Sequence, residues 1–153
     1  MTPEAKATLP ETASAVEVRI TGGIYALNRF LMTLQSKRIP VAGLTVGGNT
    51  GAMLVTVLID CPPDTARRYA TLLGALENVE ELRTADETLG VALLKPEGEG
   101  WRESASRAGI GTHEDGDIVV ASGPPETLES WLSRMESGEI TRLGTVARPG
   151  EEV

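Results

Sequence analysis

The sequence predicts an α+β protein built from two units of the same plan. Runs with alternating apolar residues, typical of strands, and runs with apolar residues three or four positions apart, typical of helices, follow one another along most of the chain. A short motif also recurs, because Pro-Pro-Asp-Thr at 62–65 and Pro-Pro-Glu-Thr at 124–127 each begin a helix-like run after an apolar strand. A duplicated unit is one explanation, and two independent proline-rich helix starts are the other.

The composition indicates a globular protein with an aliphatic core. The 153 residues are 41% hydrophobic and 24% charged, but only 3% are aromatic. The formal net charge is −8, whereas nucleic-acid binding favours clustered Lys and Arg, so we expect no nucleic-acid partner. No apolar run reaches the roughly 20 residues of a membrane-spanning helix, and residues 1–14 lack the apolar centre of a signal peptide. We therefore expect a cytoplasmic protein with no membrane partner.

The first half contains six expected elements behind a polar N-terminal segment. Residues 1–14 are small, polar and proline-containing, which predicts a disordered tail. The elements that follow are a strand at 16–20, a helix at 24–38, strands at 41–46 and 52–59 around the turn sequence GGNTG, a helix within 61–76 and a charged strand at 79–84.

This order, βαββαβ, is that of the ferredoxin-like fold, in which the first and third strands are central and the fourth lies at an edge. The chain fits this placement, since 52–59 is the most continuously apolar strand and 79–84 is the most polar. Both faces of 52–59 are mostly apolar, but the helices cover only one face of such a sheet. Something else must therefore cover the other face.

The second half repeats the scheme. Its expected elements are a strand at 89–95, a helix at 101–109, a strand at 117–123, a helix at 124–135 and a strand at 139–147. The acidic segment THEDGD at 112–117 is interpreted as a turn, with His113 in a solvated loop. The predicted fold class is thus α+β with two ferredoxin-like units.

The chain has one cysteine and one histidine, which excludes an internal disulfide framework, a thiolate metal cluster and any triad that needs several histidines. Cys61 is interpreted as a small buried residue beside Pro62, with a reactive thiol as the rarer alternative. No pair of carboxylates and no serine has an evident catalytic setting. We expect no catalytic residues and no metal site, although an active site assembled from distant residues stays open as an alternative.

The junction TGGIYALNR at 21–29 is a candidate ligand site. Glycine lets the chain turn sharply there, and the first turn of the following helix offers unpaired N–H groups to an anion. The pattern lacks the spacing of a dinucleotide fingerprint or a P-loop. A plain connector between strand and helix is the alternative.

Several motifs carry a family resemblance. Ala26-Leu27 with Arg29, LTVGG at 44–48 and ALLK at 92–95 give 16–94 a likeness to the ACT domain of the acetolactate synthase small (regulatory) subunit. The segment DIVVASGPPETLESWLSRM, followed by EITRLGTVARPGE, independently resembles the end of that subunit. The matching residues of this last phrase are Arg142, Gly144, Val146, Ala147, Arg148 and Gly150.

The resemblance implies an ACT domain at 15–86 and a C-terminal α+β domain of the small-subunit type at 87–153. It implies a chain without catalytic activity that forms a homodimer through its ACT domains, which join into one wide sheet. It also implies binding and activation of the large subunit of acetolactate synthase, in branched-chain amino acid biosynthesis. Thiamine diphosphate, Mg and FAD are expected in that large subunit, and no cofactor is expected in this chain.

The resemblance further implies an amino-acid effector at the dimer interface, which in the family is valine. The candidate effector-binding residues here are Gly22, Gly23, Ile24, Tyr25, Ala26, Pro40 and Val46. In a gap-free alignment, Gly22 stands where the family has an asparagine, Tyr25 where it has a glycine, and Pro40 where it has a second asparagine. We therefore expect valine to bind weakly or not at all, while a shifted turn at Gly23 could accept another amino acid. The alternative function is a free-standing ACT-type amino-acid sensor.

Overall fold

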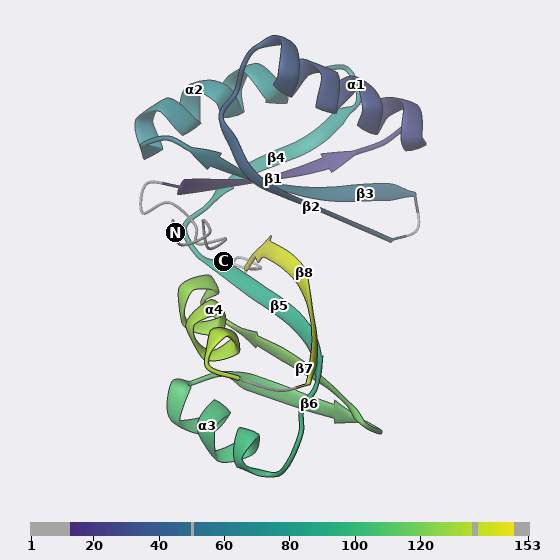
Figure 1. Cartoon of the computed structure of the whole chain (residues 1–153). Coiled ribbons are helices and arrows are strands. Elements are labelled where there is room, and N and C mark those ends of the chain that lie inside the picture. Colours follow the sequence, from purple (N-terminus) through teal and green to yellow (C-terminus); the bar gives the residue numbers. More distant parts are fainter. Residues whose placement is uncertain (1–12, 50, 136–137, 149–153) are drawn as a thin grey trace, which may run out of the picture. The chain divides into compact units, whose positions relative to one another are not determined.

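The computed structural model describes residues 13–49, 51–135 and 138–148, which form two compact units (Figure 1). The described part of the N-terminal unit comprises 13–87 together with 147–148, and the C-terminal unit comprises 88–146. Each unit is a four-stranded sheet with two helices on one face. The predicted fold class, α+β with two ferredoxin-like units, is confirmed.

The N-terminal unit has the element order βαββαβ. Its elements are β1 (Ala13–Ile20), α1 (Gly23–Ser36), β2 (Val41–Asn49), β3 (Ala52–Asp60), α2 (Pro63–Gly74) and β4 (Val79–Ala85). The strand order is β2-β3-β1-β4, and every neighbouring pair is antiparallel. The prediction that β3 is central and the polar β4 lies at an edge is confirmed.

Residues 1–12 of the predicted disordered tail lie outside the described residues. Its last two residues, Ala13 and Ser14, were assigned wrongly, because they belong to β1 and pair with Asp60 and Ile59 of β3. The Ser14 hydroxyl also donates a hydrogen bond to the Cys61 carbonyl at 3.0 Å. These long-range partners extend the strand beyond the apolar pattern that the sequence shows.

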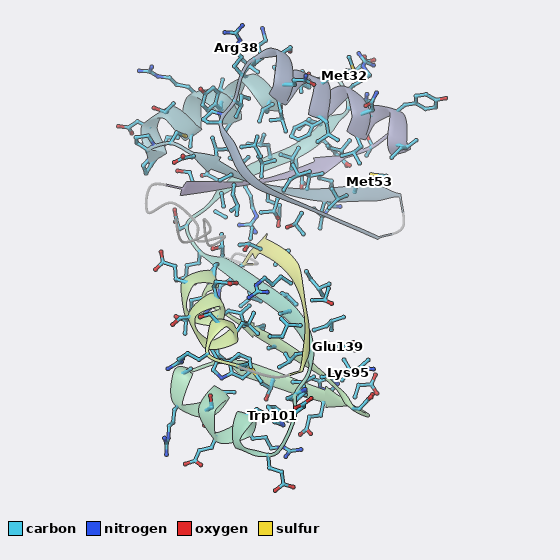
Figure 2. All side chains as sticks on the ribbon, viewed as in Figure 1. Met32, Arg38, Met53, Lys95, Trp101 and Glu139 are labelled. Carbon is cyan, nitrogen blue, oxygen red and sulfur yellow. The ribbon has the colours of Figure 1, made fainter. Side chains whose placement is uncertain are left out.

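The core of the N-terminal unit lies between the sheet and its two helices (Figure 2). Alternate residues of β1 and β3 point to the helices, since Val16 pairs with Val57 and Val18 pairs with Val55, and all four are fully buried. The main residues that the helices contribute are Leu27, Phe30 and Leu34 from α1, and Ala66 and Leu73 from α2. Burial of these side chains, which apart from Phe30 are aliphatic, is the main stabilising term, as expected for a chain with few aromatics.

The helix-free face of this sheet has an apolar half and a charged half. On β3, Thr56 and Leu58 are buried on this face, and the Thr56 hydroxyl accepts a hydrogen bond from the Ala147 N–H at 3.4 Å. On β1 and β4, oppositely charged residues face each other across the strands: Glu17 opposite Arg83 and Arg19 opposite Glu81. The Arg83–Glu17 pair is bidentate, with N···O distances of 2.9 and 3.3 Å. Paired charges therefore line the side of the sheet next to the edge strand β4.

The C-terminal unit repeats the same plan, and its core contains two tryptophans among aliphatic residues. Its elements are β5 (Thr88–Lys95), α3 (Gly100–Ala108), β6 (Gly111–Asp115), β7 (Ile118–Gly123), α4 (Pro125–Ser133) and β8 (Glu139–Ala147), in the strand order β6-β7-β5-β8. Trp101 of α3 (Figure 2) and Trp131 of α4 are both buried in the core of this unit. The Trp131 indole N–H donates to the Ser104 hydroxyl at 2.7 Å, which satisfies its polar group.

The sequence interpretation of THEDGD as a turn is wrong for most of that segment. Residues 111–115 form β6, with His113 opposite Val120 of β7, and the turn is confined to the residues around Gly116, whose φ is +64°. All five residues of β6 are exposed at the sheet edge. Such a strand needs no apolar alternation, because backbone hydrogen bonds to β7 hold it in place.

Candidate functional site

The Gly-Gly turn lies at the start of α1, and its backbone requires glycine. Gly22 is the N-cap with a φ of +103°, and Gly23 follows with a φ of +71°. The Thr21 N–H donates to the Asn78 carbonyl at 3.0 Å, which fixes the turn beside the connection between α2 and β4. A Cβ on Gly22 would lie 3.1 Å from the Cβ of Ala26 and 3.3 Å from the Oδ1 of Asn78. The residue at position 22 is therefore restricted by both conformation and space.

The seven predicted effector-binding residues fall into two groups. Gly22 to Ala26 are consecutive at the start of α1, where Ile24 is 66% and Tyr25 82% exposed while Ala26 is buried. Pro40 directly precedes β2, and Val46 lies on β2. Of these seven residues, Ala26 lines the groove described next, and the effector role of all seven stays a prediction.

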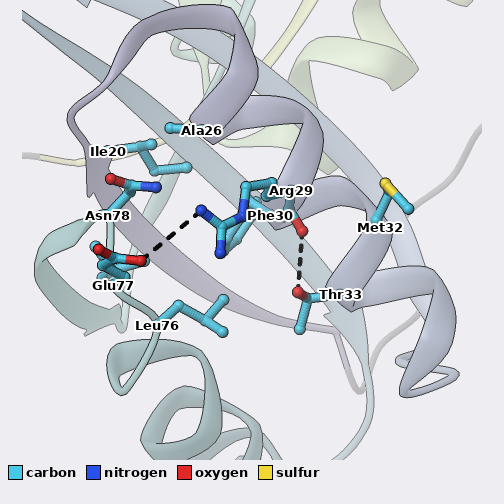
Figure 3. Close-up of a pocket in the computed structure, with 10 residues that line it drawn as sticks. Ile20, Ala26, Arg29, Phe30, Met32, Thr33, Leu76, Glu77 and Asn78 are labelled. Carbon is cyan, nitrogen blue, oxygen red and sulfur yellow. Dashed lines mark hydrogen bonds and ion pairs between the residues drawn. The ribbon is translucent and has the colours of Figure 1, made fainter.

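A groove of about 250 Å³ lies between α1 and residues 76–79, the end of the connection from α2 and the first residue of β4 (Figure 3). Its apolar floor is formed by Ile20, Ala26 and Phe30. Leu76 of the connection and Val79 of β4 add apolar surface. The groove is therefore an apolar hollow built by residues that are distant in sequence.

Polar side chains surround the mouth of this groove. Arg29 extends from α1 toward Glu77, and the distance from Nη1 to Oε2 is 3.8 Å (Figure 3). Both side chains are largely exposed, at 67% and 79%, so their mutual attraction is weak. Asn78 lies next to Glu77, and within the described part of the chain its side-chain amide makes no hydrogen bond. The groove thus has one cation, one anion, one amide and the Thr33 hydroxyl around an apolar floor.

Sequence reasoning missed Glu77 and Asn78. They follow the last apolar residue of the second helix and look like ordinary polar loop residues. Only the fold places them beside the Gly-Gly turn and across from Arg29. The one available signal is the order βαββαβ itself, which brings the connection after α2 close to the end of β1.

Cys61 has the properties of a core residue. Its side chain is buried, as predicted, and this burial, followed by the nearby Asp60 carboxylate, raises the pKa of the thiol. A raised pKa disfavours the thiolate, which is the nucleophilic form. In the described ranges, no three His, Cys, Asp or Glu side chains are placed to hold a metal ion together. His113 is exposed on β6.

Comparison with known proteins gives a structural match. No protein-family model matches the chain, and no curated protein matches its sequence. Among solved structures, the acetolactate synthase small subunit from Thermotoga maritima superposes with a TM-score of 0.71 at 13% sequence identity, covering 92% of this chain and 99% of that one. The chain therefore shares the fold of that small subunit over nearly its whole length.

Two further solved structures have lower TM-scores. Protein BT0572 from Bacteroides thetaiotaomicron gives 0.43 at 11% identity, covering 85% of this chain and 92% of that one. A protein from Galdieria sulphuraria, described as unknown, gives 0.42 at 16% identity, covering 88% of this chain and 99% of that one. Separately, none of the helices that the structure describes is both long and apolar enough to span a bilayer.

Proposed function

We infer that the chain is a non-catalytic regulatory subunit that binds and activates the large subunit of acetolactate synthase. The observation that carries this inference is the fold, because two ferredoxin-like units in one chain match a solved acetolactate synthase small subunit over 92% of this chain. The motifs of the resemblance also fall on defined elements: Ala26, Leu27 and Arg29 on α1, LTVGG on β2 and ALLK on β5. On this proposal the N-terminal unit is an ACT domain.

Homodimerisation through the N-terminal unit is part of the proposal. β2 is an edge strand of its sheet, so its outer backbone groups are available to a second copy. Leu44 and Val46 lie on its helix-facing side, opposite Val57 and Val55, and are 38% and 44% exposed. An apolar edge of this kind suits pairing of two β2 strands into one wide sheet.

On this proposal the large subunit carries out the reaction. Thiamine diphosphate, Mg and FAD belong to the large subunit, and this chain contributes contacts rather than reacting groups. We propose a cytoplasmic location, together with the enzyme of branched-chain amino acid synthesis. Valine is a poor ligand for the turn site, since Gly22 cannot provide an oriented amide.

Affinity capture from the native cell tests the proposal and separates it from its alternatives. The full chain carries an affinity tag, and the co-purified proteins are identified by mass spectrometry. A thiamine-diphosphate enzyme in stoichiometric amount supports the regulatory subunit. A different enzyme, or no partner, supports a free-standing ACT-type amino-acid sensor, and turnover by the isolated chain would show an enzyme.

A further inference from the structure

We propose that the helix-free face of the C-terminal sheet is a docking surface for a protein whose own surface is apolar at its centre and basic at its rim. On the proposed function this protein is the large subunit. The inference therefore rests on that function and deepens it, because it names the face of this chain that the large subunit contacts and the chemistry of the contact.

The two central strands of this sheet, β5 and β7, place aliphatic residues on the helix-free face. The residues of these strands that are buried under the helices alternate along the chain: Ala92, Leu94, Val119 and Ala121. Successive side chains of a strand point to opposite faces, so their neighbours lie on the helix-free face. The apolar neighbours are Val91, Leu93, Ile118 and Val120. Leu93 and Val120 are directly opposite each other, which makes the apolar surface continuous across the two strands.

The edge strand β8 extends this surface. Arg142 of β8 is on the helix side, because its guanidinium donates to the Glu129 carboxylate of α4 at 2.7 and 2.9 Å. The next residue, Leu143, therefore lies on the helix-free face, and it is 52% exposed. Ile118 is 37% exposed. Together with Val91, Leu93 and Val120, these residues form an apolar strip that lies outside the described core cluster of the unit.

The N-terminal sheet shows the pattern that a solvated face normally has. An antiparallel sheet with helices on one face usually presents polar residues to water on the other. In the N-terminal sheet, β1 and β4 do so with charged pairs, Glu17 opposite Arg83 and Arg19 opposite Glu81. The C-terminal sheet instead has aliphatic side chains on both central strands of its helix-free face. A contiguous exposed apolar patch with a polar rim indicates an interaction surface on a globular protein.

The rim of the strip is acidic. Its charged residues are Lys95 of β5, Asp115 of β6, Asp117 of the turn before β7, and Glu139 of β8. Asp115 lies directly opposite Ile118, and the Lys95 Nζ is 3.6 Å from the Asp117 Oδ2. Glu139 and Lys95 lie at the same end of the sheet (Figure 2). Three carboxylates against one ammonium give the rim a net charge of −2, with His113 beside it counted as neutral.

The charges of the two units favour a different protein over a second copy as the occupant of this face. Residues 88–146 contain ten acidic and five basic residues, whereas 13–87 with 147–148 contain eight of each. Two acidic C-terminal units brought face to face would repel each other, while a partner with a basic rim would be attracted and would bury the strip. The balanced N-terminal unit thus suits contact between two copies, and the acidic C-terminal unit suits a basic partner.

Binding of the full chain to purified large subunit, measured by biolayer interferometry, tests the location of the contact. Leu143→Asp and Ile118→Asp change exposed positions on two strands, so both variants should fold, which circular dichroism verifies. Each should weaken binding about tenfold or more, because a carboxylate would be buried against the apolar centre of the partner. Leu72→Asp is the matched control, since Leu72 is 36% exposed but lies on α2 of the other unit. Its affinity should equal that of the native chain.

The rate of association tests the chemistry of the partner's rim. The native chain should associate with the large subunit more slowly as the salt concentration rises, because salt screens the attraction between an acidic and a basic rim. The double variant Asp115→Asn with Glu139→Gln should associate more slowly than the native chain at low salt and depend less on salt. Unchanged or faster association of this variant would show that the partner's rim is not basic and would overturn the proposal.

The outcomes separate this inference from the proposed function. If the native chain binds and activates the large subunit, and both Leu143→Asp and Ile118→Asp bind as tightly as it does, the docking face is refuted and the proposed function stands. An equal loss of affinity in Leu72→Asp would also refute the face. If the native chain does not bind the large subunit, the proposed function fails and this inference fails with it.

Light scattering of the free chain distinguishes the remaining occupant, a second copy. Leu143→Asp should have the same molar mass in solution as the native chain, because the strip faces a different protein. A smaller assembly for Leu143→Asp than for the native chain would show that a second copy covers the strip and would overturn the proposal.

Discussion

Gly22 shows how a single backbone angle limits which ligand site the turn can form. Its φ of +103° lies outside the range that asparagine adopts readily, and a Cβ there would be 3.1 Å from the Cβ of Ala26. Gly22→Asn, which would restore the asparagine of the resembling family, should therefore destabilise the N-terminal unit by about 1–2 kcal/mol without creating a valine site. Urea unfolding and titration with valine measure the two effects.

Gly74→Asn is the matched control for this substitution, because Gly74 has open space around its Cβ position and no positive φ. It should change the free energy of unfolding much less than Gly22→Asn does. If Gly22→Asn were as stable as the native chain and bound valine tightly, the gap-free alignment would describe the turn better than its backbone geometry does.

Val55 lies at the centre of the N-terminal core. It is completely buried on the helix-facing side of β3, opposite Val18 of β1 and Val46 of β2. Val55→Asp places an unpaired carboxylate in this aliphatic environment and should cost more than about 4 kcal/mol, enough to unfold a unit of ordinary stability. Loss of the circular dichroism signal of this unit is the expected result, and a native-like spectrum with normal urea resistance would contradict it.

Glu114 links β6 to α3 through its contact with Arg102, and its contribution to the stability of the fold depends on pH. The hydrogen bond from Arg102, at 2.6 Å, lowers the pKa of Glu114 below its ordinary value of 4.5. A carboxyl with a lowered folded-state pKa stabilises the fold above its unfolded-state pKa, and this contribution disappears as the pH falls through the folded-state value. Glu114→Gln should therefore be less stable than the native chain at neutral pH, with the difference shrinking below about pH 4.5.

Urea midpoints of both proteins at neutral and acidic pH measure this convergence. The effect is small, because both side chains are about half exposed. If the difference in urea midpoint stays constant from neutral to acidic pH, the contact with Arg102 is not the source of the stability difference between the two proteins.

At the scale of elements, β2 carries the proposed dimer interface. Val46 is 44% exposed at this sheet edge, so Val46→Asp should leave the monomer folded but prevent two β2 strands from packing together. Light scattering should give a dimer for the native chain and a monomer for Val46→Asp. Leu72→Asp is the control, since Leu72 is also a partly exposed apolar residue but lies on α2. A native monomer at micromolar concentration would contradict the interface.

The elements differ in how far the sequence predicts them. β3 and α1 were predicted within two residues at each end, because their apolar patterns follow their burial: period two or continuous in the sheet, three and four in the helix. β6 could not be found in this way, since all of its side chains are exposed and its pairing with β7 is made by the backbone. The first residues of β1 were missed for a related reason, because Ala13 and Ser14 are held by β3 and not by an apolar pattern.

At the scale of the whole molecule, the two-unit plan was predictable and the groove was not. Each unit repeats a pattern of strands and helices that is visible in the sequence, and their sheets have corresponding strand orders. The groove depends on contacts between the end of β1 and the connection after α2, such as the hydrogen bond from Thr21 to Asn78. A sequence pattern describes which face of an element is buried, but not which loop lies beside another.

The central claim is that this chain regulates a catalytic partner, and the activity of purified acetolactate synthase large subunit tests it most directly. The rate of pyruvate condensation is measured as the full chain is added in increasing amounts, with the isolated chain as the blank. We predict no turnover by the chain alone and a saturable rise in the rate of the large subunit. An unchanged rate at saturating chain, with no complex on size-exclusion chromatography, would contradict the claim.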